Sequence, residues 1–137
     1  MTYPLPKAYR DGNLSMILDA RLVMRSALVG TLAQLALAAA SHFFLWMAGN
    51  PALFERMMLS ASAGYLYGLV LGQGYGRGAL GGAIAGGLCV VPALVVSVLL
   101  GDSEPAAMTT VTLIAIGTGA VGGFFGQMGA ILRKLGL

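Results

Sequence analysis

Four long stretches of this chain contain no aspartate, glutamate, lysine or arginine. They lie between Arg25 and Glu55, Arg56 and Arg77, Arg77 and Asp102, and Glu104 and Arg133. A helix needs about 20 apolar residues to cross the roughly 30 Å hydrocarbon core of a bilayer. Only 9% of the 137 residues are charged, against about 25% in an ordinary soluble domain. The sequence therefore predicts an all-α integral membrane protein with four transmembrane helices in a glycine-rich bundle.

Turn-forming residues between these stretches set the expected boundaries. We expect a cytoplasmic lead over residues 1–25, a membrane domain over 26–131 and a cytoplasmic tail over 132–137. Within the domain, the predicted spans cover about 26–48, 57–72, 78–100 and 106–131. The turns between them on the outer side are GNPALFER (49–56), where Glu55 and Arg56 end the apolar stretch, and GDSEP (101–105). Apolar residues at helical spacing from Leu14 to Val23 favour a short interfacial helix before the first span. A simple extension of the first span into the cytoplasm fits them equally well.

The basic residues indicate the orientation of the protein in the membrane. Seven of the eight basic residues lie on the side of the membrane that holds both predicted termini. Only Arg56 lies in a loop on the other side. Cytoplasmic loops carry the excess of lysine and arginine, so both termini are predicted to be cytoplasmic. The polar lead of more than twenty residues does not resemble a cleavable signal peptide. We expect a multi-pass protein of a bacterial inner membrane.

Glycine recurs at regular spacing in three consecutive spans. Ten of the twenty-four residues from 64 to 87 are glycine. Hydrophobic burial does not drive helices together in lipid, so small residues that allow close approach mark the contact faces, as in a glycine zipper. The predicted helix-packing seams are Gly64, Gly68 and Gly72 in the second span, Gly78, Gly82 and Gly86 in the third, and Gly119, Gly122 and Gly126 in the fourth. Spacing alone does not decide whether these seams hold the chain's own helices, further copies or a partner.

A few polar or helix-bending residues stand out within the apolar stretches. Gln34 and Gln127 are candidates for interhelical hydrogen bonds or for the polar lining of a pore. His42 is the only histidine, and we expect an interfacial side chain bonded to water or a turn carbonyl rather than a haem ligand. Pro92 removes one helical hydrogen bond and predicts a kink in the third span.

The sequence offers no evident chemistry. Gly76-x-Gly78-x-x-Gly81 matches a dinucleotide-binding fingerprint, but the preceding segment is helical and the third span carries Asp102 to the other side of the membrane. No ionisable group except His42 falls within the four predicted spans, whereas coupled carriers and most intramembrane enzymes retain such groups. We therefore expect neither enzymatic activity nor a cofactor, and no nucleic-acid partner.

Two functions fit this description best. The first is a non-catalytic small subunit, or an assembly factor, of a larger inner-membrane complex, whose partners are other integral membrane subunits or copies of itself. The second is a homo-oligomeric small channel or transporter, its pore lined by glutamines, threonines and backbone carbonyls. A lipid-contacting, membrane-shaping protein is a third alternative, suggested by the short second span.

Overall fold

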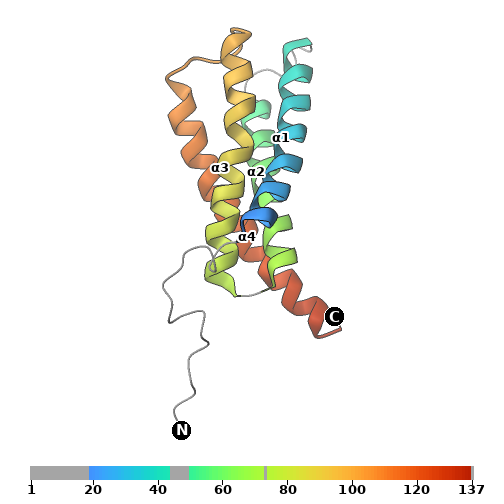
Figure 1. Ribbon diagram of the computed structural model, residues 1–137. Helices are drawn as coiled ribbons and strands as arrows, with labels where there is room; N and C mark the ends of the chain where they lie inside the picture. Colours follow the sequence, from blue (N-terminus) through green and yellow to red (C-terminus); the bar gives the residue numbers. More distant parts are fainter. Residues whose placement is uncertain (1–18, 44–49, 73, 137) are drawn as a thin grey trace.

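The computed structural model describes residues 19–43, 50–72 and 74–136, which form four α-helices (Figure 1). These are α1 (Ala20–Phe43), α2 (Asn50–Leu71), α3 (Tyr75–Leu99) and α4 (Ala107–Lys134), and the described residues contain no strand. The helices run alternately up and down, so the start of α1 and the end of α4 lie at the same end of the bundle. The helical fold class is thus as predicted.

Three of the four helices are long and apolar enough to cross a membrane. These are α1 over Ala20–Ala40, α3 over Tyr75–Leu99 and α4 over Ala107–Lys134. They support the prediction of a membrane protein with transmembrane helices. The second helix, α2, is not among them, because Glu55 and Arg56 lie within it together with several serine and tyrosine side chains. A fourth span therefore remains a prediction.

The largest difference from the expected boundaries is at the start of α2. Residues 50–56 were predicted to form a turn, but α2 begins at Asn50 and is 22 residues long. The prediction was wrong because proline fits the first turn of a helix, where its missing N–H has no intrahelical partner. Pro51 therefore starts a helix here instead of breaking one. As a result, Glu55 and Arg56 lie on helical backbone rather than in a loop.

The first helix also begins earlier than the predicted span. It runs without a break from Ala20 to Phe43, which matches an extension of the first span over residues 20–25. The rest of the expected interfacial helix, residues 14–18, lies outside the described residues. Asp19 caps α1, because its Oδ1 accepts hydrogen bonds from the N–H groups of Arg21 (3.1 Å) and Leu22 (3.2 Å).

Close helix contacts concentrate where α4 packs against α2 and α3. On α3, a Cβ atom added at Gly86 would lie 2.8 Å from both the Ala115 carbonyl oxygen and the Gly119 Cα. A Cβ added at Gly82 would lie 2.5 Å from the Gly119 oxygen. On the other side of α4, Gly64 and Gly68 of α2 lie against the backbone of Gly119 and Gly123. One face of α4 therefore contacts α3 and another contacts α2, backbone against backbone.

The remaining predicted seam positions divide into two groups. Gly122 and Gly126 of α4 lie against the backbone of Ala61 and Tyr65 on α2, and Gly78 of α3 lies against the side chain of Gln127. Gly72 differs. It follows the last residue of α2 with φ +57°, and the nearest atom to an added Cβ is Lys134 Nζ at 3.4 Å. Gly72 therefore ends a helix instead of packing between two, a role that its four-residue spacing from Gly68 could not reveal.

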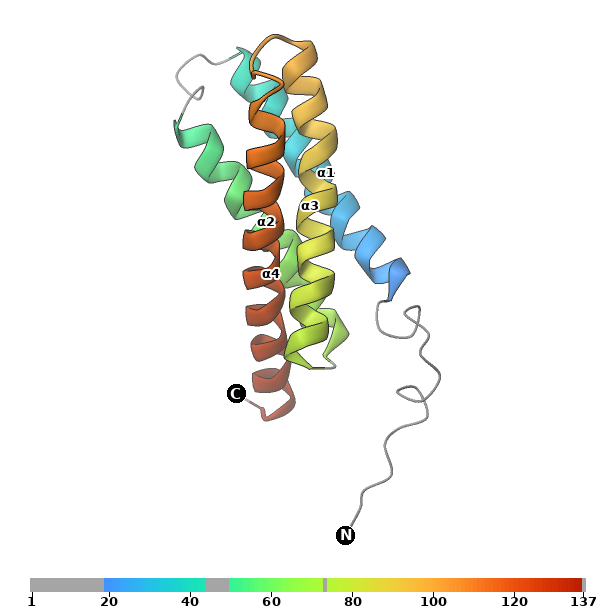
Figure 2. The same cartoon turned by 90° about the vertical axis from the view of Figure 1, so that its left-hand side faces the viewer.

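The first helix lies at the edge of the bundle. It packs against α2 and α3, and Figure 2 shows the starts of α1 and α2 leaning out on opposite sides of the α3–α4 pair. At Gly30, α1 approaches both helices closely, since a Cβ there would lie 2.8 Å from Cys89 Cβ on α3 and 2.9 Å from Ala63 Cβ on α2. Because α1 and α2 cross at an angle, they diverge on either side of this contact.

Candidate functional site: a buried polar cluster and an open groove beside it

A cluster of polar side chains is buried where α1, α2 and α3 meet. Arg56 of α2 is only 9% exposed, and its Nη2 donates a 2.8 Å hydrogen bond to Ser97 Oγ of α3. Gln34 of α1 is 1% exposed, and its Nε2 donates to the Arg56 carbonyl oxygen at 2.9 Å. Three helices are thus joined through one arginine. We define Gln34, Arg56 and Ser97 as the Arg56 cluster.

A second set of contacts continues the cluster along the bundle. Ser60, one turn after Arg56, donates to the Gly86 carbonyl at 3.0 Å and lies 3.6 Å from Cys89 Sγ. Cys89 Sγ also donates to the Gly86 oxygen, at 3.1 Å. Both side chains are fully buried. Together with the Arg56 cluster, they form a polar strip along α2 that faces α3.

Ser97→Ala should test the bond that holds the guanidinium. The substitution removes the acceptor for Arg56 Nη2 and should destabilise the protein by about 1.5 kcal/mol, the lower end of the range for a hydrogen bond to a charged group. The matched control is Ser62→Ala, because Ser62 is exposed and its hydroxyl donates only within its own helix, to the Met58 carbonyl. Midpoints of thermal unfolding in one detergent would compare the two. Equal midpoints would contradict a structural role for the Ser97–Arg56 bond.

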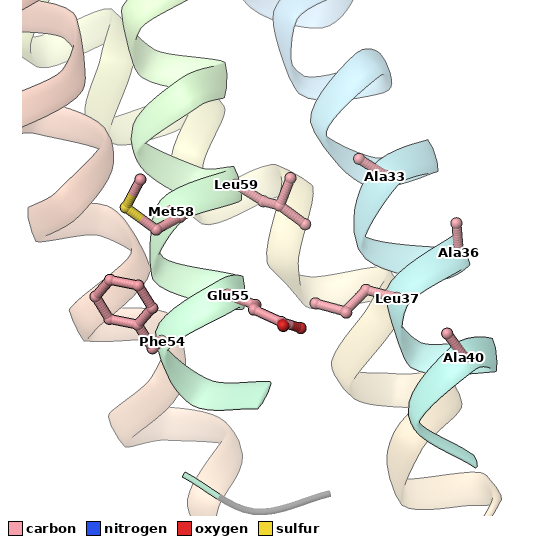
Figure 3. A pocket seen from close by; sticks show the side chains of 8 residues that line it. All are labelled: Ala33, Ala36, Leu37, Ala40, Phe54, Glu55, Met58 and Leu59. Carbon is pink, nitrogen blue, oxygen red and sulfur yellow. The ribbon is translucent and has the colours of Figure 1, made fainter. Parts of the chain in front are cut away.

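An apolar groove of about 510 Å³ opens beside the Arg56 cluster, between α1 and α2 (Figure 3). We call it the α1–α2 groove; it is lined by Ala33, Ala36, Leu37 and Ala40 of α1 and by Phe54, Glu55, Met58 and Leu59 of α2. Figure 3 shows the Glu55 side chain extending from α2 toward Leu37 of α1. Its Oε2 atom is covered by the protein and has no hydrogen-bond partner among the described residues. The groove therefore holds one acidic group within an apolar wall.

The second predicted glutamine lies at the opposite end of the bundle. Gln127 of α4 is fully buried; its Nε2 donates to the Gly68 carbonyl of α2 at 2.7 Å, and its Oε1 accepts from the Gly74 N–H at 3.1 Å. One amide thus joins α4 to the end of α2 and the start of α3. Nearby, Lys134 Nζ donates to the Gly72 carbonyl at 3.1 Å. The structure does not bring Gln34 and Gln127 together.

His42 binds a different partner from the one expected. Its Nδ1 lies 3.0 Å from Oδ2 and 3.2 Å from Oδ1 of Asp102, in the turn between α3 and α4. The contact is a hydrogen bond that becomes an ion pair when the imidazole is protonated. It ties the end of α1 to the α3–α4 turn. A carboxylate sixty residues further along the chain replaces the predicted water or turn carbonyl.

Pro92 lies inside α3, which the structure describes as continuous from Tyr75 to Leu99. The predicted kink stays a prediction.

The sequence analysis missed the two charged residues that define this region. Glu55 and Arg56 were assigned to a loop, so the four predicted spans held no ionisable group except His42. The structure corrects this, since Arg56 is buried between helices. The available signal was Pro51, which marks a helix start and places both charges in the second turn of α2. Within the described part of the chain, no group of three or more histidine, cysteine, aspartate or glutamate residues could hold a metal ion.

Comparison with known proteins adds no assignment to this geometry. No protein-family model, no curated protein and no solved structure matches the chain.

Proposed function

We propose that this protein is a non-catalytic small subunit, or an assembly and stabilising factor, of a larger membrane protein complex. The observation that supports this proposal is the α1–α2 groove. It is apolar, open and bordered by three alanines of α1, and it contains a covered carboxylate oxygen without a partner in the described chain. An unpaired buried polar group is costly, so a partner that supplies a donor to Glu55 would stabilise both chains.

The glycine contacts support the choice of the α1–α2 groove as the docking surface. Eight of the nine predicted seam glycines lie against other helices of this same chain, and Gly72 ends α2. Those glycines are therefore occupied in building the bundle. We therefore assign the docking surface to the edge formed by α1 and α2, where the helices diverge and the groove opens.

A bacterial inner membrane, with both termini of the chain in the cytoplasm, is part of the same proposal. The ends of α1 and α4 that share one end of the bundle carry Arg21, Arg25, Arg133 and Lys134. The opposite end carries the acidic residues of the α3–α4 turn. This distribution fits the positive-inside rule. Membrane lipids would then contact the many exposed apolar side chains of all four helices.

The channel alternative receives less support from the geometry. It relied on Gln34 and Gln127 as polar pore lining, but both are buried and donate hydrogen bonds within the chain.

Purification from the native membrane tests the proposal. We expect the tagged protein, extracted in mild detergent, to elute with unrelated membrane proteins in fixed stoichiometry, as measured by native mass spectrometry. A closed ring of identical chains with no other protein would favour the channel alternative. A single chain with only lipid attached would contradict both.

A further inference from the structure

The covered Oε2 atom of Glu55 indicates what kind of group the α1–α2 groove receives. Its neighbour Arg56 does not neutralise it by direct contact, because the guanidinium is turned toward Ser97 on α3. The described residues place no hydrogen-bond donor on Glu55 Oε2. A carboxylate oxygen that is covered by protein loses its water partners, and a charged hydrogen-bond donor is the group that best replaces them. The geometry thus calls for a positively charged donor in the groove.

The opposite wall of the groove indicates the shape of the molecule that carries this donor. Ala33, Ala36 and Ala40 follow one another at steps of three and four residues on α1, so their side chains share one face. Small residues at this spacing let a second helix backbone approach closely. A flexible acyl chain packs on any apolar surface and does not need small residues, whereas the close approach of a helix backbone does need them. Phe54, Met58 and Leu59 form the apolar wall on α2.

The described part of the chain does not offer the required cation. At this end of the bundle its basic side chains are His42, which is bonded to Asp102, and Arg56, which is bonded to Ser97. The other described lysines and arginines lie at the opposite end, near the starts of α1 and α3 and the end of α4. The described residues of a second copy in the same membrane orientation would therefore bring no further basic side chain to the level of Glu55.

We infer that the α1–α2 groove binds a transmembrane helix of a different membrane protein, and that this helix carries a lysine or arginine that pairs with Glu55. The inference rests on the proposed function and adds the site and the chemistry of the partner. The Glu55 pair fixes the depth of the helix in the groove, and the alanine face fixes its distance from α1.

Site-specific crosslinking in native membranes tests this pairing. A photoreactive amino acid replaces Ala36 in the groove or, as the control, Leu113, an exposed residue on the outer face of α4. We expect Ala36 to form an adduct with a transmembrane helix of another protein, and Leu113 to form none with that protein. The mapped helix should have a lysine or arginine within about one turn of the level of Glu55.

Charge substitutions then decide whether the pair exists. Glu55→Gln should lower the Ala36 adduct yield roughly tenfold, the change expected for about 1.4 kcal/mol of lost binding. Glu55→Lys should abolish the adduct, and replacing the partner's basic residue by glutamate should restore it. The amount of monodisperse protein after extraction checks that each variant is folded.

Three results would overturn the inference. They are an Ala36 adduct only with lipid, an adduct only with a second copy of this chain, and an adduct whose yield does not respond to the charge at position 55. If unrelated proteins still elute in fixed stoichiometry with Glu55→Lys, the subunit proposal survives and only the assignment of the groove fails. If the wild-type protein elutes alone, the subunit proposal itself fails.

Discussion

Gly119→Leu should prevent the bundle from forming. A Cβ at Gly119 would lie 2.9 Å from Gly86 Cα and closer still to the Gly82 carbonyl oxygen, so α3 would have to move away along its length. On the opposite side, Gly64 of α2 lies against the Gly119 carbonyl, which leaves α4 no room to retreat. Extra methylenes in a well-packed interior cost about 1–3 kcal/mol. With backbone on both sides, we expect a cost above about 3 kcal/mol and aggregated protein in place of a monodisperse peak.

The same helix provides a matched control. Gly117 is two residues away on α4, and an added Cβ there would meet nothing within 4 Å. Gly117→Leu should therefore elute and unfold like the wild-type protein, and the loss of a helical glycine is itself favourable by up to about 1 kcal/mol. Size-exclusion chromatography and thermal unfolding in one detergent measure both variants. Similar behaviour of the two variants would show that the contact at Gly119 does not hold the helices together.

Gln127→Met should produce the next largest effect. Methionine has nearly the same length but neither donates to the Gly68 carbonyl nor accepts from the Gly74 N–H. The Gly68 oxygen keeps a 3.3 Å bond from the Gly72 N–H, whereas the Gly74 N–H loses this acceptor. The variant therefore loses two hydrogen bonds, each worth about 0.5–1.5 kcal/mol net, while the exposed Gly74 N–H can bind water instead. We expect a destabilisation of about 2 kcal/mol, measured from the unfolding midpoint in a denaturant titration.

The same substitution at the other buried glutamine should cost much less. Gln34 donates from Nε2 to the Arg56 carbonyl, and its Oε1 has no hydrogen-bond partner within the described residues. Gln34→Met loses that bond but also removes the unpaired oxygen, so the variant should lie within about 1 kcal/mol of the wild-type protein. A larger loss at Gln34 than at Gln127 would contradict the bonding described for both residues.

The helical fold could be predicted because charge is costly in lipid and the charge-free stretches are long. The spacing of the glycines predicts which face of a helix carries small side chains. It could not indicate which helices those faces join. Gly119 lies against Gly82 and Gly86 on one side and Gly64 on the other, and this depends on the order of the helices in space. The spacing of the glycines could not identify the helix ends either. Gly72 fits the four-residue repeat, but its positive φ places it after the end of α2.

The candidate site was less accessible from the sequence. Glu55 and Arg56 are charged, and charged residues commonly end a membrane span, so we assigned both residues to a loop. Their placement in the second turn of α2 depends on whether Pro51 ends a turn or begins a helix, and proline permits both. The His42–Asp102 contact joins residues sixty positions apart. Such a pairing follows from the arrangement of the helices and has no local signal.

The buried thiol of Cys89 can report how often the helices that cover it separate. The only thiol of the chain is fully buried beneath Gly30 of α1. A small, membrane-permeant maleimide can reach it when α1 separates from α2 and α3, or when α2, whose Ser60 also covers the thiol, moves away from α3. The rate of alkylation therefore measures how often the helices around Cys89 separate, by the same logic that relates hydrogen exchange to local unfolding. An occupant of the neighbouring surface that holds α1 in place would slow that reaction, and no engineered cysteine would be needed to see it.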